Sequence, residues 1–122
     1  MSRTNRKDLM MITLNKAMDL YLATLETEGK SPRYIDWLKT RLRYFSNYIQ
    51  DVYGSDFKLQ DLSVEDGREY IRHLMARDTL YQGHPMHKQK KGKLKLQYNH
   101  GLGRAVRSFS SWAYDEGYLE EN

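Results

Sequence analysis

The apolar positions of this chain recur at helical spacing in four separate runs. Within each run they advance in steps of three and four residues, the spacing that places side chains on one face of an α-helix. The runs are Ile12, Leu14, Met18, Tyr21, Leu22 and Leu25; Ile35, Leu38, Leu42, Phe45, Ile49 and Val52; Val64, Tyr70, Ile71, Leu74 and Met75; and Tyr98, Leu102, Ala105, Val106, Phe109, Trp112 and Ala113. We therefore expect an all-α protein, a compact bundle of about four helices that buries these faces.

Short polar signals mark the expected helix starts. Ser31 precedes Pro32 at the start of the second run, and this pair is typical of a helix start because serine accepts from a free backbone N–H and proline has none to satisfy. Ser63, with Asp66 three positions later, resembles a capping box ahead of the third run. Gly29 and Gly54 follow the first and second runs and predict where those helices end.

The stretch between the third and fourth runs has no apolar period. Residues 79–95 contain glycine, proline and a group of lysines, so the sequence predicts a long basic loop there, with a short hairpin as the alternative, and a fourth helix that begins near Tyr98. The length of 122 residues suits one domain. We expect a flexible segment at 1–11, the helical domain at 12–119, and the start of a linker at 120–122.

Composition excludes several classes of protein. Hydrophobic content of 39% and charged content of 30% fit a soluble globular protein, and no apolar run approaches the ~20 residues that a membrane-spanning helix needs. The N-terminus lacks the apolar stretch of a secretion signal, and cysteine is absent, so we expect a cytoplasmic protein without disulfides. His84 and His87 have metal-ligand spacing but no further ligands nearby, so we expect no metal and no cofactor.

Charge is distributed unevenly along the chain. The net charge is only +4, but no Asp or Glu occurs between Leu80 and Tyr114, where cations recur. A second basic group at 30–43 is opposed only by Asp36, and the largest group of acidic residues, seven of the 16, lies between Asp51 and Asp78. This pattern is typical of a protein that presents a positive side to a polyanion, whereas a merely solvated surface is the alternative for any single lysine cluster.

Helical geometry predicts which polar side chains share the outward faces. If the second and fourth runs are buried, the residues turned outward are Arg33, Trp37, Thr40, Arg43, Tyr44 and Asn47 on one helix and His100, Arg104, Arg107 and Ser111 on the other. Arginine can fork onto guanine or phosphate, and asparagine pairs with adenine. The sequence therefore favours two helices that lie against duplex DNA. The alternative is that Trp37 and Tyr44 complete a packing face and that the arginines are solvated.

The loop lysines extend the same hypothesis. They are Lys88, Lys90, Lys91 and Lys93, and we expect them to reach flanking phosphates. A disordered tether is the alternative for this stretch.

Three stretches of the chain together resemble a known family. They are TLNKAMDLYLATLETEGKSPRYIDWLKTRLRYF (13–45), LSVEDGREYIRHL (62–74) and RAVRSFSSWAYDEGYLEEN (104–122). Their combination resembles the N-terminal core-binding domain of the tyrosine recombinases, the phage integrase family. Lys95 and Leu96 depart from the pattern, because they stand where the family usually has a Ser-Pro helix start.

The resemblance implies a SAM-like helical bundle that forms one half of a C-shaped clamp around a recombination site. It adds Ser31 and Tyr34 to Arg33 as DNA contacts at the entry to the second helix. It also implies three partners: double-stranded DNA, a C-terminal catalytic domain outside this chain, and sister protomers in a tetramer.

We expect no catalytic residue in this chain. His100 and Arg104 have one residue too many between them for the His-x-x-Arg motif of the catalytic domain, and the tyrosines lack an arginine pocket that would activate a nucleophile. The expected function is therefore a non-catalytic DNA-binding domain of a site-specific recombinase. The alternative is a helical protein-interaction or regulatory module with an acidic partner.

Overall fold

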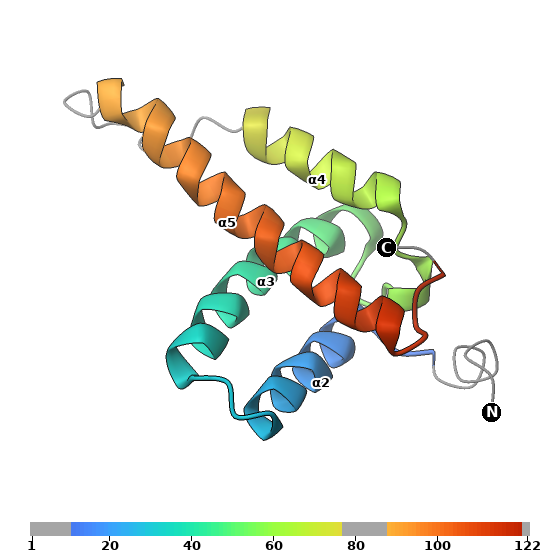
Figure 1. Cartoon of the computed structure of the whole chain (residues 1–122). Coiled ribbons are helices and arrows are strands. Elements are labelled where there is room, and N and C mark those ends of the chain that lie inside the picture. Colours follow the sequence, from blue (N-terminus) through green and yellow to red (C-terminus); the bar gives the residue numbers. More distant parts are fainter. Residues whose placement is uncertain (1–10, 77–87, 121–122) are drawn as a thin grey trace.

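The computed structural model describes residues 11–76 and 88–120, with side chains for residues 11–76 and 97–120. These residues form the α-helices α2 (Leu14–Thr27), α3 (Pro32–Tyr53), α4 (Val64–Ala76) and α5 (Lys88–Asp115), and one turn of 3₁₀ helix, η1 (Leu59–Asp61) (Figure 1). Within the described ranges there is no strand, and the β-type pairing is an isolated bridge between Thr13 and Lys58. The expected all-α fold is confirmed.

The local signals in the sequence act as predicted. The backbone N–H of Tyr34 donates to Ser31 Oγ over 3.1 Å, with Pro32 in the first turn of α3. Ser63 and Asp66 form the reciprocal pair of a capping box, because the Asp66 N–H donates to Ser63 Oγ over 3.2 Å and the Ser63 N–H donates to Asp66 Oδ2 over 2.9 Å. Gly29 ends the turn after α2 at φ +84°, a left-handed conformation that glycine adopts without steric cost.

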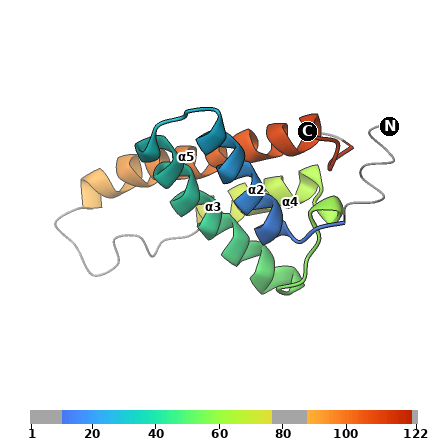
Figure 2. The ribbon, with the colours of Figure 1, turned by 90° about the horizontal axis from the view of Figure 1, so that it is seen from below.

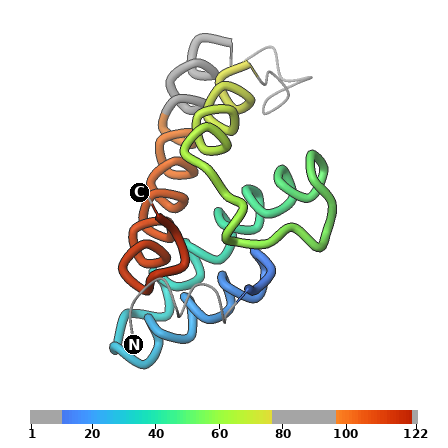
Figure 3. Tube along the Cα trace, turned by 90° about the vertical axis from the view of Figure 1, so that its right-hand side faces the viewer, coloured from blue at the N-terminus to red at the C-terminus, as the bar shows by residue number. Residues whose placement is uncertain are grey.

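Helix α5 is the centre of the bundle. It packs against α2, α3 and α4, and α2 packs against α3 as an antiparallel hairpin. Figure 2 shows the same arrangement from below, and in Figure 3 α4 lies beside α5 while α2 lies near the C-terminal end of α5. Helices α4 and α5 run antiparallel, because Leu74 is bonded to Asn99 while Ile71 lies beside Gly103.

The core lies where the apolar faces of the helices meet. Its most buried large side chains include Phe45, Leu38, Leu42 and Ile49 from α3 and Leu102 and Phe109 from α5. Aromatic contacts tie the elements together: Phe109 meets Tyr21 of α2 edge-on at 5.7 Å, and Phe45 meets Tyr70 of α4 at 4.8 Å between ring centroids. These two contacts help to hold α2 against α5 and α4 against α3.

The predicted loop between the third and fourth helices is wrong for residues 88–95. Helix α5 begins at Lys88, so the lysine-rich stretch continues the helix that carries Tyr98. Lysine, glutamine and leucine are good helix formers, and adding turns to an existing helix costs far less than nucleating a new one. The lack of an apolar period had suggested a loop. Residues 77–87 lie outside the described residues.

Three apolar positions expected in the core are exposed instead. Val52 is 54% exposed at the end of α3, and Ile71 and Met75 of α4 are 40% and 61% exposed. The buried line of α4 consists of Tyr70 and Leu74, because α3 and α5 cover the helix on one side only. Ile71 and Met75 lie just beside that line and remain open to solvent.

Candidate nucleic-acid interface

The first turn of α3 presents a polar and aromatic edge. Ser31, Arg33 and Tyr34 are exposed, and the Ser31 cap fixes the backbone that carries them. The partial positive charge at a helix N-terminus adds to the charge of the Arg33 guanidinium. This turn therefore favours anions.

Helices α3 and α5 approach closely at Gly101. A Cβ atom at this glycine would lie 3.1 Å from Arg41 Nε and 3.5 Å from Trp37 Cζ2. The Arg41 guanidinium lies 4.3 Å from the centre of the Trp37 ring, and its Nη1 donates to the Trp37 carbonyl over 3.2 Å. The missing side chain at Gly101 is thus what lets Arg41 lie between the two helices.

The crossing leaves an open hollow of about 360 Å³, which we call the α3–α5 hollow. It is lined by Ser31, Arg33, Tyr34 and Trp37 of α3 and by Arg104 of α5. The Arg104 guanidinium lies 5.6 Å from the centre of the Trp37 ring, and the Tyr34 and Trp37 rings are nearly parallel at 10°, with centroids 6.2 Å apart. The structure therefore brings together predicted residues from two helices that are far apart in sequence.

The sequence left open whether Trp37 is part of a DNA-binding face or of a packing face, and in the structure it belongs to both surfaces. It is half-buried and packs at the edge of the core, but it also lines the α3–α5 hollow. Arg41, which sequence reasoning missed, stacks on it from one turn further along. The available signal was the spacing of Arg41 four residues after Trp37, which lets the two side chains meet on a helix surface.

The other predicted residues of α3 lie on its remaining surface. Thr40 is exposed, and Arg43 and Asn47 are exposed along the flank that faces α2, where they line a second hollow. Tyr44 is 44% exposed and meets Tyr98 of α5 edge-on at 6.1 Å. The predicted polar residues of α3 are thus spread over more of the helix surface than the part that lines the α3–α5 hollow.

The predicted face of α5 divides into two. His100 and Arg104 are exposed, and Arg104 lines the α3–α5 hollow. Arg107 is exposed but lies against α4, where it lines a different hollow. Ser111 is half-buried. Arg104 and Arg107 therefore line different hollows.

The predicted lysines lie on the N-terminal part of α5. Lys88, Lys90, Lys91 and Lys93 belong to a helical backbone, while their side chains lie outside the described residues. At ~1.5 Å per residue, the segment from Lys88 to Gln97 carries the helix axis roughly 15 Å beyond Tyr98. The backbone of these four lysines is therefore part of helix α5 and not of a loop.

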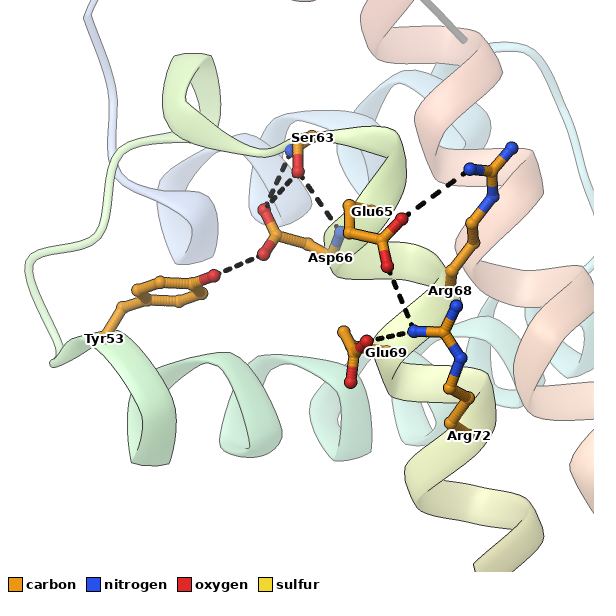
Figure 4. Close-up of polar contacts among 7 residues, drawn as sticks. All are labelled: Tyr53, Ser63, Glu65, Asp66, Arg68, Glu69 and Arg72. Carbon is orange, nitrogen blue, oxygen red and sulfur yellow. Dashed lines mark hydrogen bonds and ion pairs between the residues drawn. The ribbon is translucent and has the colours of Figure 1, made fainter.

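Among the described side chains, the charged residues of α4 form ion pairs with one another, whereas the arginines around the α3–α5 hollow do not. Arg72 Nη1 donates to Glu65 over 3.0 Å and also contacts Glu69, and Arg68 lies 3.6 Å from Glu65 (Figure 4). The hydrogen bond from Arg72 lowers the pKa of Glu65 below its usual value. Arg33, Arg43 and Arg104 form no ion pair with any residue whose side chain is described, so their charge is available to an external anion.

A second polar group fixes the start of α4. The Tyr53 hydroxyl donates to Asp66 Oδ1 over 2.5 Å, and the other oxygen of this buried carboxylate accepts from Ser63 (Figure 4). The hydrogen bond to Asp66 raises the pKa of Tyr53. Every oxygen of the carboxylate is thus engaged in holding α3, the capping box and α4 together, which is a structural task.

Metal sites and membrane-spanning helices are two further possibilities for the described parts of the chain. Among those residues no group of three or more His, Asp or Glu side chains is arranged to hold a metal ion, and the predicted pair His84 and His87 lies outside them. None of the helices in the same ranges is long and apolar enough to cross a membrane.

Comparisons with protein-family models, with curated proteins and with solved structures found no match to this chain.

Proposed function

We propose that this chain is a non-catalytic DNA-binding domain of a site-specific recombinase of the tyrosine recombinase type. In this proposal the domain grips duplex DNA as one half of a clamp, and a catalytic domain of the parent protein breaks and rejoins the strands. The observation that carries the proposal is the α3–α5 hollow, which Arg33 and Arg104 line together with Tyr34 and Trp37.

The chemistry of this hollow suits a nucleic-acid backbone. Arginine binds phosphate through two parallel hydrogen bonds with charge assistance, which fixes orientation as well as affinity. Ser31 adds a hydroxyl and the α3 N-terminus adds its partial positive charge. The resemblance of the sequence to the core-binding domain of tyrosine recombinases supports the same surface, because it implies DNA contacts at Ser31, Arg33 and Tyr34.

The rest of the outward faces extend the proposed contact. Thr40, Arg43 and Asn47 supply donors and acceptors along α3 that can reach base edges or phosphates. The lysine-bearing start of α5 extends in one direction from the hollow and supplies positions for flanking phosphates. His100 lies on the same helix, one turn before Arg104.

A helical protein-interaction module with an acidic partner is the second candidate for this surface. The same unpaired arginines and exposed aromatic rings favour it, because Arg and Tyr are enriched in protein interfaces. The two candidates differ in the ligand and in how strongly binding depends on salt.

The proposal is tested by measuring the binding of short duplexes to single arginine variants. Arg33→Ala and Arg104→Ala should each weaken duplex binding about tenfold, because a charge-assisted hydrogen bond contributes about 1.5 kcal/mol or more. Arg33 is exposed and its loss should leave the melting temperature unchanged, whereas loss of the exposed Arg104, which lies over the Trp37 ring, should lower it by no more than a few degrees. Fluorescence anisotropy with a labelled duplex gives the affinity, and circular dichroism gives the melting temperature.

Arg72→Ala is the matched control. Arg72 is also an exposed arginine, but it is paired with Glu65 and Glu69 on α4, so its loss should leave duplex binding unchanged. If Arg72→Ala weakened binding as much as Arg33→Ala and Arg104→Ala, the DNA would be responding to net charge alone. The assignment of the α3–α5 hollow would then be wrong.

A further inference from the structure

A second hollow lies between α4 and α5, away from the hollow that the proposed function uses. Its volume is about 290 Å³, and its walls are mainly apolar, with contributions from Phe45, Leu62, Val64, Tyr70, Ile71 and Val106. We call it the α4–α5 groove. Phosphates gain nothing from apolar walls, so DNA binding does not explain it.

The groove exists because both helices carry glycine where they face each other. Within the described part of the chain, a Cβ atom at Gly67 of α4 would meet nothing within 4 Å, and one at Gly103 of α5 would meet only Ile71 Cδ1, at 3.3 Å. Beyond the groove the helices are held together, since Asn99 Nδ2 donates to the Leu74 carbonyl over 3.2 Å. The open space is therefore a fixed feature of the helix pair.

An exposed apolar stripe continues the groove along α4. Val64, Gly67, Ile71 and Met75 follow one another at steps of three and four residues, so they lie on one face of the helix. Ile71 is 40% exposed and Met75 is 61% exposed. The stripe extends over roughly 16 Å at ~1.5 Å per residue, which is the length of three turns of a second helix. Exposed apolar patches of this kind mark interaction surfaces.

The charges at the edge of the groove have one sign. Arg68 and Arg107 line it, and among the residues whose side chains are described no carboxylate does. Arg107 forms no ion pair with any residue whose side chain is described, and the pair between Arg68 and Glu65 is long, at 3.6 Å, with both side chains more than half exposed. Such a solvated pair is worth little, so Arg68 is available to a partner.

We propose that the α4–α5 groove binds an acidic amphipathic helix of a partner protein. Apolar side chains at i, i+4 and i+7 of that helix lie along the stripe from Val64 to Met75, and one of them enters the space above Gly67. Carboxylates on its flanks pair with Arg68 and Arg107. The volume of about 290 Å³ accommodates one large aromatic or two aliphatic side chains, since an engineered cavity of roughly 150 Å³ holds a benzene molecule.

The test uses a fluorescein-labelled helical peptide of about four turns, with leucines at i, i+4 and i+7 and glutamates on both flanks. Fluorescence anisotropy should show saturable binding to the protein. A peptide with lysine in place of each glutamate, and another with alanine in place of each leucine, should each bind at least tenfold more weakly.

Gly67→Leu is the decisive variant because the leucine side chain would occupy the groove that the partner helix is proposed to enter. The open space around this position lets the protein fold, which circular dichroism verifies, and peptide binding should fall at least tenfold. Gly67→Ala is the matched control, since it makes the same change in helix propensity without filling the space, and its affinity should stay within about threefold of the original.

A double charge reversal tests the edge of the groove independently of the glycine. Arg68→Glu with Arg107→Glu changes two exposed side chains and should reverse the preference, so that the lysine peptide binds more tightly than the glutamate peptide. Equal binding of the two peptides to the original protein would overturn the proposal. So would the absence of any peptide binding, or unchanged binding in folded Gly67→Leu.

The same variant separates this proposal from the DNA-binding proposal. Gly67→Leu should leave duplex binding unchanged, because Gly67 is not part of the α3–α5 hollow. A variant that lost duplex binding and kept peptide binding would assign the groove to nucleic acid and overturn the docking proposal.

Discussion

Alanine at Gly101 is expected to disturb the crossing of α3 and α5, although alanine is the better helix former. Its Cβ would lie 3.1 Å from Arg41 Nε, inside normal contact distance. Arg41 is held in place by the hydrogen bond from Nη1 to the Trp37 carbonyl and by its position over the Trp37 ring. The added methyl group therefore displaces Arg41 from both contacts.

The balance of these effects gives the expected magnitude. Replacing glycine by alanine inside a helix gains about 1 kcal/mol. The lost hydrogen bond costs about 1 kcal/mol, and the lost cation–π contact costs about 1 kcal/mol at a partly buried site. Gly101→Ala should therefore destabilise the protein by about 1 kcal/mol, whereas Gly67→Ala, with nothing within 4 Å of its Cβ, should stabilise it by about 0.5 to 1 kcal/mol.

Urea unfolding followed by circular dichroism measures both variants on one scale, with equal m-values as the check that only stability has changed. The same pair of measurements in an Arg41→Ala background isolates the contact. There the penalty at Gly101 should disappear, and Gly101→Ala should become stabilising. If Gly101→Ala stabilised the original protein as much as Gly67→Ala does, Arg41 would not be confined at the crossing and the reasoning would be refuted.

Three further substitutions test other parts of the fold. Ser63→Ala removes the cap shared with Asp66 and should cost about 1 kcal/mol in urea unfolding; no loss would mean that the capping box does not hold α4. Phe109→Ala empties a fully buried site and should cost about 3 to 5 kcal/mol, and a loss below about 1 kcal/mol would contradict its central place in the core. Glu65→Gln tests a pH effect, because the hydrogen bond from Arg72 lowers the pKa of Glu65 in the folded state. The carboxylate therefore stabilises the fold at neutral pH, and this contribution is lost as pH falls through the lowered pKa. The melting temperatures of the two proteins should differ at pH 7 and converge once the pH falls below the lowered pKa of Glu65, or in high salt. A pH-independent difference would exclude the ion pair as its cause.

The helices were predictable because their signals are local. Ser31 and Pro32, the pair Ser63 and Asp66, and the glycine that ends α2 each act through neighbouring backbone groups, so they can be read without knowledge of the tertiary structure. The start of α5 was not predictable in the same way. Its first turns have no apolar period, and helix propensity alone did not distinguish them from a basic loop.

Solvent exposure was harder to predict than helix position. The sequence gives Ile71 and Met75 the spacing of a buried face, yet the structure leaves both exposed because α3 and α5 cover only one side of α4. How many sides of a helix are covered depends on the positions of its neighbours, which periodicity does not contain.

The candidate site was predictable in part for the same reason. Arg33 and Arg104 were expected on outward faces, but that they meet around one hollow follows from the angle at which α3 and α5 cross. Arg107 was expected beside Arg104 and lies instead at the α4–α5 groove. Arg41 was missed because the helical wheel placed it between the buried and exposed faces, and its role depends on the missing side chain at Gly101.

The salt dependence of duplex binding tests the central claim most directly. A titration of this protein with a labelled short duplex, followed by anisotropy over a series of salt concentrations, gives the slope of log affinity against log salt. Contacts to about five to eight phosphates predict a slope between about −4.5 and −7. Absence of duplex binding by the folded protein at low salt, or binding that salt leaves unchanged, would contradict the account.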